Sequence, residues 1–104
     1  MRHERFVLPP RDTAKNRYPL IEARFFDSLE RYVQEHIRCG GFLNAVLENN
    51  LVEAVTQADR DASIALRQIV LYIYNEMPGN CWGDSEKVKA WVAQPYNPVC
   101  QKEA

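Results

Sequence analysis

Residues on which many enzymes depend are scarce in this sequence. It holds two histidines and four glycines, and it has no Gly-x-Ser-x-Gly or other nucleophile signature. A glycine-rich phosphate loop is also missing, because Gly40 and Gly41 follow a predicted helix where a dinucleotide fingerprint follows a strand. These absences predict that the protein is not an enzyme and that it binds no cofactor.

An excess of charge of either sign is missing too. The sequence has thirteen Lys and Arg and fourteen Asp and Glu, so its formal net charge is -1. This balance excludes a protein whose whole surface binds nucleic acid. The longest wholly apolar stretch, residues 69–74, is far shorter than a membrane-spanning helix. No apolar signal segment precedes the three cysteines, which are an odd number without a close-spaced pair. We therefore expect a cytoplasmic protein with no membrane contact and no structural disulfide.

What is present is typical of one folded domain. The 104 residues include 46% hydrophobic and 11% aromatic side chains, enough apolar surface to offset the entropy lost on ordering the chain. The sequence predicts three parts: an extended basic arm over residues 1–19, a helical domain over 20–94, and an irregular tail over 95–104.

The arm is predicted not to be helical, because Pro9, Pro10 and Pro19 fix the backbone and remove hydrogen-bond donors. It is rich in Lys and Arg, which could neutralise phosphates, and its Phe6 and Tyr18 could stack on nucleic-acid bases. The candidate residues for this alternative function, nucleic-acid binding, are Arg2, Arg5, Arg11, Lys15 and Arg17.

Helical periodicity begins after the arm. Apolar residues recur every four positions from Ile21 to Ile37, which predicts an amphipathic helix over 20–38 with Pro19 in its first turn and its end at Gly40 and Gly41. Residues 42–58 predict a short helix, a break, and a second helix capped by Asn50 and Glu53 whose buried side is Leu51, Ala54, Val55 and Ala58. One bent helix over 42–58 is an open alternative.

The longest helix is predicted over 60–77, with Asp59 and Asp61 at its start. Its apolar residues cover most of the circumference, which indicates a central helix surrounded by the others. A last helix is predicted over 85–93, with an N-cap in Gly83-Asp84-Ser85. The predicted fold class is therefore all-α: a compact bundle of about five short helices around the central one.

A metal site is the first chemistry to weigh. His36-x-x-Cys39 is one pair of suitable ligands, with Cys81 and Cys100 as distant additions, whereas strong zinc motifs come as two close pairs. We therefore predict no metal, with buried free thiols as the better interpretation.

The Pro78–Gly83 turn is the best candidate surface for a protein partner. It presents Trp82 between two well-signalled helices, flanked by Glu76, Asp84 and Glu86. A tryptophan in such a turn either packs over the helix ends as part of the core or stands out as an anchor, and the sequence leaves both roles open.

Residues 31–92 resemble a group of small phage and prophage proteins. The likeness is carried by Gly41-Phe42-Leu43-Asn44-Ala45-Val46, Leu51-x-Glu53-Ala54-Val55, Tyr74-Asn75-Glu76-x-Pro78, Cys81-Trp82-Gly83 and Val88-x-Ala90-Trp91. The resemblance implies an accessory protein of a mobile element and brings no active site. Together with the missing catalytic residues, it favours stoichiometric binding to a protein partner, as an inhibitor or regulator of a host system.

Overall fold

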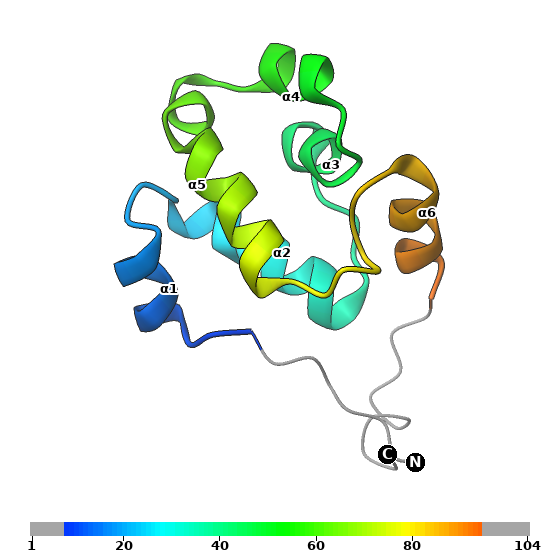
Figure 1. The fold of residues 1–104 in the computed structure, drawn as a ribbon, viewed down its shortest axis with the longest axis horizontal. Helices are drawn as coiled ribbons and strands as arrows, with labels where there is room; N and C mark the ends of the chain where they lie inside the picture. The colour runs from blue at the N-terminus through cyan, green and yellow to red at the C-terminus, as the bar shows by residue number, and fades with distance from the viewer. Residues whose placement is uncertain (1–7, 95–104) are drawn as a thin grey trace.

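Residues 8–94 are described by a computed structural model, in which this part of the chain forms six α-helices and no strand (Figure 1). The helices are α1 (Arg11–Arg17), α2 (Ala23–Glu35), α3 (Gly41–Leu47), α4 (Leu51–Gln57), α5 (Arg60–Glu76) and α6 (Ser85–Ala93). The predicted all-α fold is confirmed. None of these helices is long and apolar enough to cross a membrane.

The centre of the core lies between α2 and α5, which cross in Figure 1. The rings of Phe26 and Tyr72 meet edge to face with centroids 5.4 Å apart, and Leu29 and Ile69 are fully buried. Four-residue spacing on α2 places such side chains on one face, and that face packs against the same kind of surface on α5. The predicted stripe of α2 is confirmed, except for Ile37, which is exposed.

The limits of α2 differ from the prediction at both ends. The helix begins at Ala23, after a turn that contains Pro19, and it ends at His36, whose φ of 59° is left-handed. The prediction that Gly40 and Gly41 supply this conformation is wrong. Gly40 instead lies in extended conformation at the N-cap of α3. Ile37 follows the helix end, which is why it leaves the buried stripe.

The prediction of an extended path through residues 11–17 is wrong, because these residues form α1. Pro10 occupies the N-cap with a φ of -56°, and a proline there costs no hydrogen bond since the first amides of a helix lack partners within the helix. Long-range contacts then hold the helix. Ala14 is fully buried, and Arg11 bonds to Asp27 and Glu30 on α2.

Two helices, not one bent helix, occupy residues 41–57. The break is at Asn49, whose φ of 61° is left-handed, and the side chain of Asn50 accepts a hydrogen bond from the amide of Glu53 at the start of α4. The predicted buried side of α4 is only partly right. Ala54 is buried, whereas Leu51 is 70% exposed and Val55 is 53% exposed.

The prediction for α5 is correct in extent, and part of the circumference of this helix is exposed. Asp59 caps it by accepting from the amide of Ala62 at 2.8 Å. Its buried residues, which include Ile69 and Tyr72, cover part of its circumference, whereas Val70 and Tyr74 are exposed. Helix α5 therefore keeps apolar side chains on its surface as well as in the core.

Helix α6 has the predicted limits and is joined to the end of α2. Asp84 caps it by accepting from the amide of Lys87. The indole N–H of Trp91 donates to the carbonyl oxygen of Tyr32 at 2.7 Å, and His36 Nδ1 donates to the carbonyl oxygen of Trp91 at 2.9 Å. The predicted tail, residues 95–104, lies outside the described residues.

Candidate functional site

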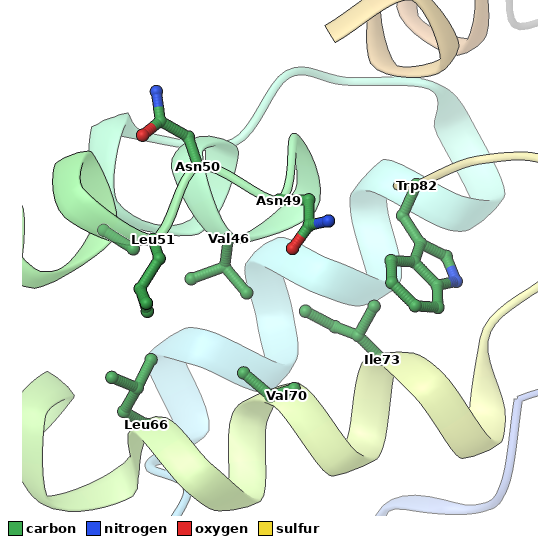
Figure 2. Close-up of a pocket in the computed structure, with 9 residues that line it drawn as sticks. Val46, Asn49, Asn50, Leu51, Leu66, Val70, Ile73 and Trp82 are labelled. Atoms are coloured by element: carbon green, nitrogen blue, oxygen red, sulfur yellow. The ribbon is translucent and has the colours of Figure 1, made fainter. Parts of the chain in front are cut away.

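An apolar groove opens between α4, α5 and the turn that precedes α6 (Figure 2). Its volume is about 90 Å³. Side chains from α3, the turn after it, α4, α5 and the turn before α6 line it: Val46, Asn49, Asn50, Leu51, Ala54, Leu66, Val70, Ile73 and Trp82. Leu66, Val70 and Ile73 repeat at spacings of four and three, so they form one ridge along α5. Figure 2 shows this ridge facing Leu51 and Val46 across the groove.

Hydrogen bonds on both sides of Trp82 fix the turn that carries it. The amide of Gly83 donates to the carbonyl oxygen of Leu47 at 2.7 Å, and the hydroxyl of Tyr32 donates to the carbonyl oxygen of Cys81 at 2.6 Å. Gly83 has a φ of 124°, a conformation that side chains rarely adopt. The turn therefore holds the indole at one end of the groove without needing a partner to order it.

Trp82 combines the two roles that the sequence left open. It is partly buried and packs against the core, yet it also lines the groove. Its ring meets that of Tyr74 edge to face, with centroids 6.1 Å apart, and Tyr74 is 68% exposed. The indole is thus a wall of the groove supported by the core.

Further large hydrophobic side chains are exposed on the two helices that flank the groove. Most of the large hydrophobic residues that are exposed in residues 8–94 lie on α4 and α5: Leu51, Val52, Val55, Ile64, Val70 and Tyr74. We call the groove, together with these exposed residues of its two flanking helices, the α4–α5 face. Exposed large hydrophobic side chains beside an apolar groove are a feature of interaction sites.

The electrostatics of the groove are simple, because no lining residue is charged. The nearest charge along α5 is Arg67, which directly follows Leu66 and lies one turn before Val70. Arg67 is exposed and forms no ion pair within the described residues. The lining offers apolar burial, with Arg67 one turn along α5 from Val70, and it contains no nucleophile or acid–base pair.

The acidic residues predicted to flank Trp82 lie outside the groove, and two of them hold other parts of the fold together. The carboxylate of Glu76 accepts from Arg17 and from the hydroxyl of Tyr18, both at 2.9 Å, and so fastens α1 to α5. Asp84 is the cap of α6, and Glu86 lies exposed in the first turn of that helix. Of the four predicted partner-binding residues, the groove contains Trp82 alone.

Two of the three arm bases that the structure describes are paired with carboxylates. Arg11 bonds to both oxygens of Glu30 and to Asp27, while Arg17 pairs with Glu76. The hydrogen bonds that Arg11 donates to Glu30, followed by the one to Asp27, raise the pKa of Arg11. Lys15 is exposed. The other two candidates, Arg2 and Arg5, lie outside the described residues.

The pair considered as metal ligands is divided between two environments. His36 stacks on Trp91 with ring centroids 4.5 Å apart, whereas Cys39 is buried beside the carbonyl oxygen of Ser28. Burial raises the pKa of the Cys39 thiol to about 12, and burial likewise raises that of Cys81 to about 12. No group of three or more His, Cys, Asp or Glu within residues 8–94 is placed to hold a metal ion.

Sequence reasoning missed most of the groove. Leu51 and Val55 look like ordinary core positions, since periodicity alone does not say whether a partner covers an apolar face. A signal was nevertheless present. Residues 60–77 have apolar side chains around most of the circumference, more than the short neighbouring helices can cover.

Comparison with protein-family models, with curated proteins and with solved structures finds no match for this chain.

Proposed function

We propose that this protein is a non-catalytic binding protein that holds another protein against its α4–α5 face. The observation that carries the proposal is the gathering of exposed aliphatic side chains around an uncharged groove with a tryptophan at its end. The resemblance of residues 31–92 to small phage and prophage proteins supports an accessory role of this kind. The activity is stoichiometric, since one chain occupies one partner and changes what that partner does.

The physical case rests on apolar side chains that are exposed in the isolated chain and that a partner would bury. Full burial of a valine or leucine side chain contributes about 1.5–3 kcal/mol. Leu51 and Val70 are exposed in the groove lining, and Tyr74 contacts Trp82 at its end, so a single partner covers all three at once. Because the groove walls are helices and a hydrogen-bonded turn, little ordering opposes the association.

Leu51→Glu is the variant that tests the proposal. Leu51 lines the groove and occupies the first position of α4, where an acidic residue is favourable to the helix, so the variant is expected to fold. It places a charge in the apolar groove. Ile37→Glu is the matched control, because Ile37 is also an exposed aliphatic residue and lies outside the groove.

The experiment is affinity capture from cells of the organism that carries the gene, with wild type and both variants as bait. We expect a protein captured at one copy per chain by wild type and Ile37→Glu, and lost with Leu51→Glu. If Leu51→Glu captures the same protein as wild type does, the partner binds outside the α4–α5 face. Nuclease-sensitive recovery of nucleic acid alone, lost on deletion of residues 1–18, would favour nucleic-acid binding through the arm.

A further inference from the structure

Arg67 and the size of the groove together indicate what kind of protein segment fits the α4–α5 face. We infer that the occupant is an amphipathic α-helix of the partner, which inserts one aliphatic side chain into the groove and places a carboxylate against Arg67. This inference rests on the function proposed above and names the chemistry of the partner.

The volume of the groove selects the anchor. An apolar cavity that holds a benzene ring measures about 150 Å³. The groove, at about 90 Å³, is smaller, so it matches an aliphatic side chain such as leucine, isoleucine or methionine better than an aromatic ring.

The shape of the surroundings selects a helix. Leu66, Val70 and Ile73 form a ridge on α5, and the groove lies between this ridge and Leu51 on α4. A side chain inserted between such ridges is the usual contact of one helix with others. An extended peptide that adds to a sheet edge finds no strand within residues 8–94. Proline-rich peptides need several aromatic rings, and Trp82 is the one aromatic residue in the lining.

The charge beside the groove selects the flanking residue. Arg67 is exposed, lacks an ion pair in the described part of the chain, and lies one turn from Val70. The groove lining contains no carboxylate that would compete for it. A partner helix with Asp or Glu three or four residues from its anchor gains an ion pair there, whereas Lys or Arg at that position is repelled.

Selection from a displayed library tests the inference. The library is an alanine-based helical peptide randomised at positions i, i+3, i+4 and i+7, selected on wild-type protein with Leu51→Glu as counter-selection. We expect one position to converge on Leu, Ile or Met, and a position three or four residues away to converge on Asp or Glu. Selection on Arg67→Glu is expected to keep the aliphatic anchor and to replace the acidic preference with Lys or Arg.

Measured affinities provide the second readout. For the selected peptide, changing the anchor to Ala is expected to weaken binding to wild type by about tenfold or more. Reversing its acidic residue to Lys is expected to weaken binding about threefold at low salt and less at high salt. Arg31→Glu is the matched control protein, since Arg31 is an exposed base on α2 away from the groove, and its affinity is expected to equal that of wild type.

Several results would overturn the inference. An aromatic anchor, absence of an acidic preference, or no enrichment over Leu51→Glu each contradicts it. A dimer of wild type that Leu51→Glu dissociates would assign the groove to a second copy of the chain. If the natural partner is captured through the groove but presents an extended or basic segment, this inference fails while the proposed function stands.

Discussion

The two tryptophans differ in what their indole N–H groups meet. Trp91 donates to the carbonyl oxygen of Tyr32 at 2.7 Å, whereas Trp82 has a buried Nε1 without a hydrogen-bond partner among the described residues. A buried hydrogen bond contributes about 0.5–1.5 kcal/mol, and a buried donor left unpaired costs about 1–3 kcal/mol. A tryptophan therefore contributes more to stability at position 91 than at position 82.

Replacing each tryptophan with phenylalanine measures this difference. Trp91→Phe removes a satisfied hydrogen bond and is expected to lower the free energy of unfolding by about 1–2 kcal/mol. Trp82→Phe removes an unpaired donor together with part of the ring, so its cost is expected to be smaller. Urea unfolding followed by far-UV circular dichroism gives both values. Equal losses, or a larger loss for Trp82→Phe, would contradict the assignment.

The two buried cysteines are expected to be unreactive. Burial raises the pKa of both the Cys39 and the Cys81 thiol to about 12, and only the thiolate attacks a disulfide reagent. In a Cys100→Ser variant at pH 8, we expect neither thiol to react rapidly with Ellman's reagent until urea is added. Rapid reaction of either thiol in the native protein would show that its surroundings open to solvent.

Helix α5 begins with a cap whose contribution to stability depends on pH. Asp59 accepts from the amide of Ala62 and pairs with Arg24, and these contacts, the amide first, lower its pKa below the usual 3.8. A carboxylate whose pKa is lowered on folding stabilises the protein above its unfolded pKa, and this contribution is lost as the pH falls through the folded value. The pKa of Asp61 is shifted in the opposite direction, because the charge of Glu22 raises it.

Comparison of Asp59→Asn with Asp59→Ala separates the hydrogen bond from the charge. Asparagine also accepts from the helix amides, so Asp59→Asn is expected to keep more of the melting temperature at pH 7 than Asp59→Ala. Below about pH 3.8, wild type is expected to lose its advantage over Asp59→Asn. Thermal melts across this range provide the measurement, and a constant difference between the two proteins at every pH would contradict it.

The sequence predicts helices well where their signals are local. Asp59, Asn50 and Asp84 each cap a helix at the predicted place, because a cap needs only a side-chain oxygen and an amide a few residues away. Helix α1 was missed because its support is distant. Arg11 bonds to Glu30, which lies nineteen positions along the chain, and no local sequence pattern predicts that contact.

The same reasoning explains what could be predicted of the candidate site. Trp82 stands out in the sequence as a large aromatic residue in a turn between helices, and it does line the groove. Glu76 does not, because folding brings Tyr18 within 2.9 Å of it. The aliphatic walls of the groove look like core residues, and only the packed structure shows which of them lack a neighbour.

At the scale of the whole molecule, stability depends on the contact of α2 with α5. Ile69 is fully buried in this contact, whereas Ile64 on the same helix is 55% exposed. A carboxylate at position 69 loses the burial of isoleucine and gains a desolvation cost, together on the order of 5 kcal/mol. That is comparable to the whole stability of a small domain.

Ile69→Asp is therefore expected to unfold the protein, while Ile64→Asp is expected to keep the helical far-UV spectrum and a cooperative melt. The two variants make the same chemical change on the same helix, so they differ only in burial. A folded Ile69→Asp variant would mean that the core is not centred between α2 and α5. An unfolded Ile64→Asp variant would mean that the α4–α5 face is itself needed for folding.

The placement of the two indoles also gives the molecule a built-in optical reporter. Trp82 lines the groove, while Trp91 is held against Tyr32 and His36 and takes no part in the lining. An occupant that displaces water from the groove changes the polarity around Trp82 alone, and Trp91 supplies a constant background. Intrinsic fluorescence therefore follows occupancy of the groove in the unlabelled protein.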